Sequence, residues 1–245
     1  MNLDFSVKKK KKNLLAFSAG VDSSALFFLL LEQSIPFDIA IVNYNLRVQS
    51  KDEVFYAKNL ASKYKKNIFL KETKIENISN FEKNARDIRY KFFDEIILEN
   101  SYENLITAHQ LNDKLEWFMM QLSKGAGLVE LIGFNEFEQK ENHKIYKPLL
   151  NITKDELENY LKINNHKYFV DQSNFDEKYK RNYFRHTFSD KSLENFSSGV
   201  KKSFEYLQID LDSLNIQNKP IKKIKELEIF LNQNDDNLNI RTIDL

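Results

Sequence analysis

One segment near the N-terminus constrains the fold more than any other. An apolar run at 14–17 leads into a short turn rich in serine, and a second apolar run at 25–31 follows it. The first run has the length of a buried strand, and the second is typical of a helix. A strand that passes through a tight turn into a helix leaves backbone N–H groups and the positive end of the helix dipole at the turn. The sequence therefore predicts an anion-binding loop at residues 18–24.

The side chains of this turn suit a phosphate group and a cation. Gly20 allows close approach of the backbone, and the serine hydroxyls add hydrogen-bond donors. Asp22 would repel a phosphate unless a cation lay between them, so it indicates Mg²⁺. The segment has neither a Walker lysine nor the glycines of a dinucleotide fingerprint. The alternative is an ordinary helix start with an acidic residue in its first turn.

Strand-like and helix-like segments alternate along the first half of the chain. Strands are expected at 13–18, 37–43, 67–71 and 104–108, and helices at 22–33, 51–65, 83–99 and 112–123. Repeated strand–helix units predict an α/β fold with a doubly wound, mostly parallel sheet covered on both faces. Ligands bind such sheets at the carboxyl ends of the strands, where segments 18–24, 43–47 and 109–113 fall.

The pattern becomes less regular after residue 133. The polar stretch 136–144 is expected to be a loop, and 153–163 a helix that begins with a capping box of Thr153 and Glu156. From residue 189 the pattern is helical and polar, with five apolar residues at helical spacing: Leu193, Phe196, Val200, Phe204 and Leu207. We expect a main domain at 1–188 and a small helical extension at 189–245.

Composition excludes several classes of site. The chain has no cysteine, which rules out disulfides, cysteine-ligated zinc or iron–sulfur sites, and sulfur carried on a cysteine. Its net charge is +1, so a nucleic-acid partner needs a local basic patch. No apolar stretch has the length of a membrane span, and no signal-like segment follows the lysines at 8–12, which favours a cytoplasmic protein without membrane contact. We interpret that lysine run as a solvated leader to the first strand.

A second candidate site follows the fourth expected strand. On a helix, Leu111 and Leu115 share a stripe, and His109, Asp113 and Glu116 lie on the opposite side. Two carboxylates one turn apart at this edge of the sheet suit Mg²⁺ or a substrate ammonium group. The alternative is the solvated acidic face of an amphipathic helix.

Two groups of basic residues complete the candidates. Arg86 and Arg89 share a face of the expected helix beside Tyr90, which suits either a phosphate clamp or a surface ion-pair helix. The region 179–186 interleaves basic residues, Arg181 among them, with aromatic rings. Such a mixture suits RNA, where phosphates attract cations and bases stack on rings.

Taken in order, these motifs resemble the tRNA(Ile)-lysidine synthase family of PP-loop ATP pyrophosphatases, over residues 13–187. The family loop is Ser-Gly-Gly-x-Asp-Ser, and here Ala19 replaces its first glycine. The remaining matches are segments 43–47, 85–90, 107–116, 125–127, 147–150, 171–174 and 179–182. The resemblance implies that residues 1–188 form the catalytic domain and that 189–245 is a linker or a reduced tRNA-binding region.

The resemblance also implies a reaction. ATP adenylates O2 of the wobble cytidine in an isoleucine tRNA with a CAU anticodon, and pyrophosphate leaves. The ε-amine of L-lysine then attacks C2 and displaces AMP, giving lysidine. The implied ligands are therefore ATP, Mg²⁺, L-lysine and that tRNA, and a homodimer is one candidate assembly.

Roles for individual residues follow from the same resemblance. The residues implied in ATP binding are Ser18, Ala19, Gly20, Val21, Asp22, Ser23, Ser24 and Arg181, with Asp22 also holding Mg²⁺. Asp113 and Glu116 are implied in lysine binding. The catalytic candidates are Asp22, Arg86, Asp113 and Arg181, and the tRNA-binding candidates are Arg47, Arg89, Lys180 and Arg185.

Two acids of the family pattern are replaced by amides, Asn43 and Asn112. These departures bear on the number of metal ions and leave two alternatives open. One is another PP-loop adenylating enzyme, such as a tRNA thiolase or NAD synthetase; the other is a non-catalytic RNA-binding relative. The lack of cysteine argues against cysteine-dependent thiolases, and NAD synthetase would not explain the basic group around Arg181.

Overall fold

A computed structural model describes residues 3, 11–74, 81–170, 180–213, 220–225, 227–236 and 239. The expected alternation of strands and helices is confirmed. In chain order the elements are β1 (Asn13–Ala16), α1 (Val21–Glu32), β2 (Asp38–Asn43), α2 (Gln49–Lys63), β3 (Ile68–Glu72), α3 (Phe81–Asn100), β4 (Asn104–Ile106), α4 (Leu111–Leu122), α5 (Leu128–Leu131), β5 (Phe137–Gln139), β6 (Lys144–Tyr146), α6 (Lys154–Ile163), α7 (Lys180–Phe184), η3 (Arg185–Ser189), α8 (Asp190–Ser213), β7 (Lys222–Ile224) and β8 (Leu227–Ile229).

The central sheet has the strand order β3-β2-β1-β4-β6-β5. All neighbouring strands are parallel except β5, which pairs antiparallel with β6. The chain moves outward from β1 to β3 and then returns to β4 on the other side of β1. This reversal makes a topological switch point between β1 and β4, and ligands bind open α/β sheets beyond the carboxyl ends of the strands at such a point.

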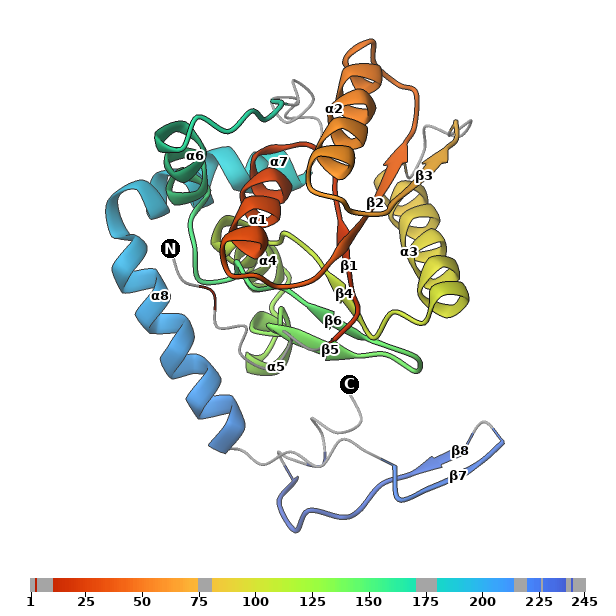
Figure 1. Cartoon of the computed structure of the whole chain (residues 1–245). Coiled ribbons are helices and arrows are strands. Elements are labelled where there is room, and N and C mark those ends of the chain that lie inside the picture. Colours follow the sequence, from red (N-terminus) through yellow and green to blue (C-terminus); the bar gives the residue numbers. More distant parts are fainter. Residues whose placement is uncertain are drawn as a thin grey trace.

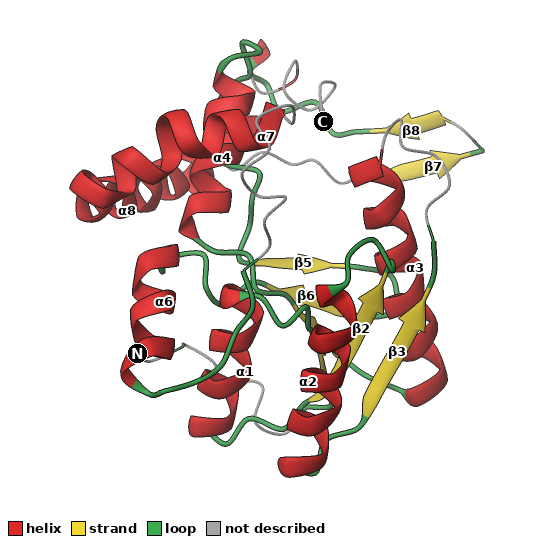
Figure 2. Ribbon diagram, turned by 90° about the horizontal axis from the view of Figure 1, so that it is seen from above, coloured by secondary structure: helices red, strands yellow, loops and turns green. Residues whose placement is uncertain are grey.

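Helices cover both faces of the sheet, as expected from the sequence (Figures 1 and 2). Successive side chains of a strand point to opposite faces, so Leu15 and Ile39 pack with α1, α2 and α6, whereas Leu14 and Ala40 pack with α3. The two clusters are built from aliphatic and aromatic side chains. They fix the positions of β1 and β4, and hence of the two loops that leave them.

A third apolar cluster joins the C-terminal helices to the rest of the molecule. Leu193 and Phe204 of α8 pack with Leu111 and Leu115 of α4 and with Ile132, which follows α5. The helical stripe expected on α8 is therefore largely confirmed. Phe196 was the wrong member of it: its side chain is 68% exposed, and its backbone (φ −131°, ψ 22°) kinks the helix at that point.

Two expectations about local structure have clear outcomes. The capping box of α6 is confirmed, because Glu156 N–H donates to Thr153 Oγ1 at 3.2 Å and Thr153 N–H donates to Glu156 Oε2 at 2.7 Å. The expected loop at 136–144 was wrong, since β5 and β6 form a hairpin there. Its three-residue strands are polar because β5 is an exposed sheet edge, and β6 gains its pairing from β4, far away in the sequence. The hairpin of β7 and β8 was likewise not expected from the sequence.

The N-terminal lysines that the structure describes lie at the amino end of the sheet. Lys11 pairs with Glu103, and Lys12 Nζ donates to the Asn100 carbonyl and stacks over the Tyr102 ring. Residues 8–10 lie outside the described part of the chain. Lys11 and Lys12 therefore sit opposite the edge that carries the candidate site.

Candidate functional site

The loop between β1 and α1 is held open by hydrogen bonds among its own small residues. Ser18 N–H donates to Ser23 Oγ at 3.2 Å, and the two hydroxyls of Ser18 and Ser23 lie 3.1 Å apart. Gly20 is the N-cap of α1, and within the described residues no side chain caps this helix. The N–H groups of the first turn are thus left for an anion, as expected from the sequence.

Ala19 is the residue that departs from the family loop, and it adopts a left-handed conformation with φ 63°. This conformation favours glycine and costs other residues about 1–2 kcal/mol. Ala19 is fully buried, and its carbonyl accepts from Phe169 N–H at 2.9 Å, so the segment before α7 pins the loop from outside. The loop therefore keeps its shape despite the extra Cβ.

Asp22 is the buried acid of the loop. Its Oδ1 has no hydrogen-bond partner among the residues that the structure describes. Burial, with a further contribution from the Asp113 carboxylate, raises the pKa of Asp22 to about 7. An unpaired carboxylate oxygen in a loop that opens a helix fits a divalent cation bound together with phosphate oxygens.

No group of three or more acidic or histidine side chains in the described residues could hold a metal ion alone. A Mg²⁺ ion at Asp22 would therefore complete its oxygen coordination with nucleotide phosphates and water, the usual arrangement for this ion. The donor set fits a metal that arrives with the nucleotide.

The second candidate site lies at the start of α4. Gln110 caps the helix: its Oε1 accepts from Asn112 N–H at 2.5 Å, and Asp113 Oδ2 accepts from Gln110 N–H at 3.1 Å. This cap leaves Asp113 Oδ1 facing α7. Glu116, one turn later, is only 1% exposed. The alternative of a solvated acidic face was therefore wrong for Glu116.

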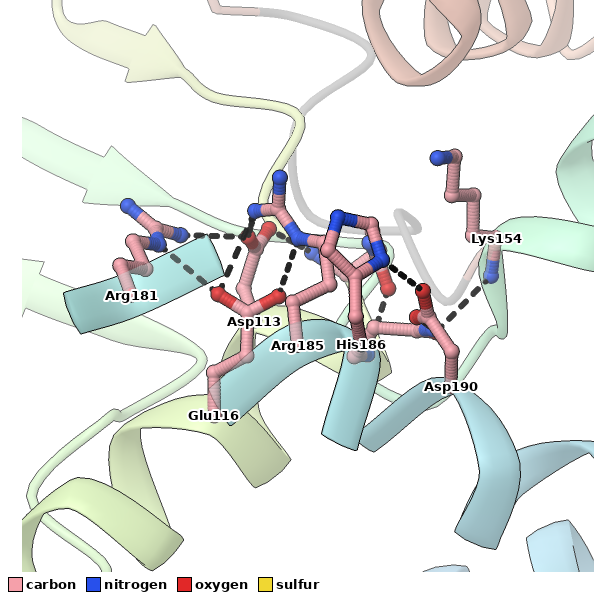
Figure 3. A network of polar contacts seen from close by, with 9 residues as sticks. Asp113, Glu116, Lys154, Arg181, Arg185, His186 and Asp190 are labelled. Atoms are coloured by element: carbon pink, nitrogen blue, oxygen red, sulfur yellow. Dashed lines mark hydrogen bonds and ion pairs between the residues drawn. The ribbon is translucent and has the colours of Figure 1, made fainter. Parts of the chain in front are cut away.

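Two arginines neutralise these carboxylates (Figure 3). Arg181 of α7 donates from Nη2 to Asp113 Oδ1 at 2.5 Å and from Nε to Glu116 Oε2 at 2.8 Å. Arg185 of η3 donates from Nε to Glu116 Oε1 at 2.6 Å and from Nη2 to Glu116 Oε2 at 3.3 Å. Two acids and two guanidinium groups make a cluster of no net charge, which we call the carboxylate–arginine cluster.

The cluster shifts the pKa values of its members. Burial acts to raise the pKa of Asp113, but Arg181, with His109 and Arg185, holds it below its usual range. Burial and the Asp113 carboxylate raise the pKa of Glu116, and the two guanidinium groups oppose that rise. The carboxylates in turn raise the pKa values of both arginines, which stay protonated.

His109 lies beside the cluster at the end of β4. Its Nδ1 is 2.9 Å from Thr107 Oγ1, and its ring meets Phe134 edge-on. Burial lowers the pKa of His109 to about 4, with further lowering by Arg181, Lys147 and Arg86. His109 is therefore neutral at physiological pH. Sequence reasoning placed it on the acidic face of the helix but assigned it no role.

The loop and the cluster lie at the same edge of the sheet, because they follow the neighbouring parallel strands β1 and β4; the Asp113 and Glu116 charges accordingly raise the pKa of Asp22. Lys154, the first residue of α6, acts on the same carboxyl and lowers its pKa. Lys154 was missed by sequence reasoning; its signal was its place directly after the Thr153 cap. The charge of Arg86 contributes to the lowered pKa of His109. The Arg86 guanidinium carbon lies 5.0 Å from the centroid of the Tyr90 ring.

The residues expected to bind tRNA are more dispersed. Arg47 Nη2 lies 3.8 Å from Glu53 Oε2 of α2, and Arg89 is exposed on α3. Arg185 points inward to Glu116 with its side chain 15% exposed, so its position suits the cluster rather than an RNA surface. Segment 171–179 and the side chain of Lys180 lie outside the described part of the structure.

Comparisons with known proteins identify the family. Residues 2–191 match the model of the PP-loop domain. A tRNA(Ile)-lysidine synthase from Campylobacter jejuni is 51% identical over 224 residues, which cover 91% of this chain and 68% of that protein. The chain belongs to the tRNA(Ile)-lysidine synthase family. A tRNA(Ile)-lysidine synthase from Helicobacter hepaticus is also 51% identical, over 86% of this chain and 51% of its own length.

A solved structure confirms the fold of this lysidine synthase family member. The U34-tRNA thiolase NcsA from Methanococcus maripaludis, determined with its [4Fe-4S] cluster, superposes with a TM-score of 0.68. It covers 84% of this chain and 74% of its own, with 21% sequence identity. The α/β fold expected from the sequence is thereby confirmed, and the family membership expected from the motifs is confirmed by the relatives.

Proposed function

We propose that this chain is an ATP-dependent ligase that joins L-lysine to C2 of the wobble cytidine in an isoleucine tRNA with a CAU anticodon. One observation carries the proposal beyond family membership. A phosphate-binding loop with an acid whose Oδ1 is buried and unpaired lies at the same edge of the sheet as the carboxylates of Asp113 and Glu116, which are 11% and 1% exposed. The loop suits ATP, and the carboxylates suit the ammonium group of an amino acid.

The first step adenylates the cytidine. The O2 atom attacks the α-phosphorus of ATP, and the bond to the bridging oxygen of pyrophosphate breaks. The N–H groups of the first turn of α1, with the hydroxyls of Ser18 and Ser23, bind the departing pyrophosphate, and Asp22 is the residue that would hold Mg²⁺. The metal supplies charge neutralisation on the phosphates.

The second step forms the carbon–nitrogen bond. The neutral ε-amine of lysine attacks C2, AMP leaves with the O2 atom, and the amine loses a proton. Asp113 and Glu116 bind the α-ammonium group, which orients the side chain toward the base. Arg86, whose charge contributes to the lowered pKa of His109, is proposed to face the reacting centre.

Substrate tRNA is proposed to approach over the exposed basic residues Arg47 and Arg89, and over Lys180, whose side chain lies outside the described part of the structure. We propose the cytoplasm as the location of the protein, because the reaction uses tRNA and ATP. A homodimer stays a prediction for its assembly. No helix in the described ranges is long and apolar enough to cross a bilayer. The division after residue 188 stays a proposal; it falls within η3, just before α8 begins at Asp190.

The two amide replacements do not favour a non-catalytic relative. Asn43 is buried and donates to Asn45 Oδ1 at 3.0 Å, so it shapes its own loop. Asn112 is held by Asp190 and by the backbone of α6. Both amides have structural partners, and Asp22 with its orphaned oxygen remains for the metal.

The test is transfer of radiolabelled lysine to an isoleucine tRNA transcript with a CAU anticodon, in the presence of ATP and Mg²⁺. The matched control transcript carries uridine in place of the wobble cytidine. We expect incorporation into the first transcript alone, with one pyrophosphate released for each lysine joined. Pyrophosphate release that depends on a different acceptor would reassign the substrate, and no release with any RNA would overturn the ligase assignment.

A further inference from the structure

The proposed lysine site is already filled by arginine. Asp113 Oδ1 accepts from Arg181, and Asp113 Oδ2 accepts from the backbone N–H of Gln110. Glu116 Oε1 accepts from Arg185, and Glu116 Oε2 accepts from both Arg185 and Arg181. Each oxygen of the two carboxylates thus has a hydrogen-bond partner.

Charge makes simultaneous occupation unfavourable. The carboxylate–arginine cluster is neutral, so a lysine α-ammonium group would add a third cation to two anions in a buried place. Like charges at contact distance in a partly desolvated site repel strongly. One guanidinium group must therefore leave before the ammonium group binds.

The two arginines differ in how easily they can leave. The Arg185 side chain is 15% exposed and donates twice to Glu116. The Arg181 side chain is 41% exposed and makes one bond to each carboxylate. Figure 3 shows both arginines directed at the two carboxylates, and the greater exposure of Arg181 makes it the one that can leave while Arg185 stays to compensate Glu116.

Bound nucleotide would place its phosphates, which are strong anions, near the carboxylate–arginine cluster. The phosphate-binding loop follows β1, and α4 with the cluster follows β4; since β1 and β4 are neighbouring parallel strands, the loop and the cluster lie at the same edge of the sheet. Phosphates at that loop would attract the Arg181 guanidinium group, because guanidinium groups bind phosphate oxygens in a bidentate manner.

We propose that Arg181 is shared between two ligands: it covers the lysine-binding carboxylates in the free enzyme, and it moves to the nucleotide phosphates when ATP binds. Asp113 Oδ1 then loses its hydrogen-bond donor and Glu116 Oε2 keeps only the longer bond from Arg185, so both can accept from the lysine ammonium group. Arg181 acts here as a positioning residue that orders the two substrates. The proposal rests on the proposed lysine ligase function.

The exchange predicts positive and reciprocal coupling. When nucleotide binds alone, Arg181 moves away and the charges of the two carboxylates are only partly compensated. When lysine binds alone, it must displace the Arg181 guanidinium group, which then has no other anion to bind. Each ligand removes the obstacle to the other. The two affinities must therefore rise by the same factor, in the range of about 10- to 100-fold for couplings of this kind.

The experiment measures lysine binding to the full chain by equilibrium dialysis with radiolabelled L-lysine. Dialysis is done with Mg²⁺ alone and with Mg²⁺ plus α,β-methylene-ATP, which cannot be split between the α and β phosphates. We expect the wild-type chain to bind lysine about 10- to 100-fold more tightly with the analogue. Arg181→Gln should bind lysine tightly without nucleotide, and its coupling factor should fall to about 1.

Arg185→Gln is the matched control, because it removes a guanidinium group from the same carboxylates. It leaves Arg181 in place, so the coupling to nucleotide should persist. Thermal melts check that each variant folds, and Arg185→Lys, which keeps the charge, replaces the control if Arg185→Gln does not fold. Arg181→Lys should restore part of the coupling, since an ammonium group also moves between carboxylates and phosphates.

Each outcome decides the matter. Equal lysine affinity with and without the analogue in the wild-type chain overturns the exchange, and lysine transfer to tRNA would then leave the ligase function standing. Loss of coupling to the same extent in Arg181→Gln and Arg185→Gln also overturns it. Failure to bind lysine under either condition, together with no transfer to tRNA, overturns both proposals.

Discussion

The side-chain amide of Asn112 donates to Asp190 Oδ1 at 2.8 Å, and its oxygen accepts from the Lys154 backbone N–H at 3.1 Å. A single buried side chain thus ties the first turn of α4 to the starts of α6 and α8. His186 lies on the other side of Asp190, with its Nδ1 3.5 Å from Oδ2. The amide that replaces a family aspartate therefore holds the C-terminal helix against the site.

Asn112→Asp should destabilise the protein. The new carboxylate still accepts from Lys154 N–H, but it loses the donor to Asp190 and places two acids together. We expect a loss of about 1–3 kcal/mol, seen as a fall in Tm of about 2–4 °C per kcal/mol. The double variant with Asp190→Asn restores an amide–carboxylate pair with its roles reversed, and should recover most of the loss. A double variant no more stable than Asn112→Asp would contradict the pairing.

Asp22→Asn should stop adenylation and yet stabilise the fold. Because burial raises the pKa of Asp22 from 3.8 to about 7, the folded protein holds a proton that the unfolded chain has released, and stability is lost as pH rises through that window. Asparagine does not ionise, so the variant does not lose this stability as the pH rises. The variant should therefore gain Tm over wild type progressively from about pH 4 to about pH 7 and keep a constant advantage above it.

The same variant loses its metal ligand, so pyrophosphate release should fall by about a hundredfold or more. Thermal melts across this pH range and a pyrophosphate assay with tRNA provide the two readouts. Wild-type turnover in Asp22→Asn would remove Asp22 from the metal site. A parallel pH dependence of both Tm curves would contradict the raised pKa.

Local signals were enough to predict the framework and the phosphate-binding loop. The apolar run, the small turn and the helix at 13–33 are all encoded within one segment, and their positions agree with β1 and α1. The hairpin of β5 and β6 could not be predicted in this way. Its strands are short, and β6 is held by pairing with β4, more than 30 residues earlier in the chain, while β5 pairs only with β6.

The acids of the site could be predicted, but their partners could not. Asp113 and Glu116 were singled out from their spacing on a helix, whereas the arginines that pair with them come from α7 and η3. Helical periodicity predicts solvent for a charged residue opposite an apolar stripe. A carboxylate such as Glu116 is buried because two guanidinium groups compensate it, and that arrangement depends on tertiary structure.

His109 should stay neutral well below neutral pH. Its pKa is lowered from 6.5 to about 4 by burial, so the stability linked to its neutral form is present above about pH 6.5 and is lost as pH falls through about 4. Proton NMR of the imidazole C–H groups should show the shift of a neutral ring at about pH 5. His109→Gln assigns the signal by its loss and should flatten the acid limb of the stability curve. Protonation of this ring near pH 6.5 would contradict its burial.

Glu116→Gln should weaken the use of lysine more than the use of ATP. The buried carboxylate loses its charge, which removes a charged hydrogen bond to the ammonium group worth about 1.5–3 kcal/mol. The KM for lysine in the tRNA transfer assay should rise about 10- to 100-fold, and the KM for ATP should change little. Glu205→Gln is the matched control, because Glu205 makes a surface pair with Lys202 on α8. An unchanged lysine KM in Glu116→Gln, with the control also unchanged, would remove Glu116 from the lysine site.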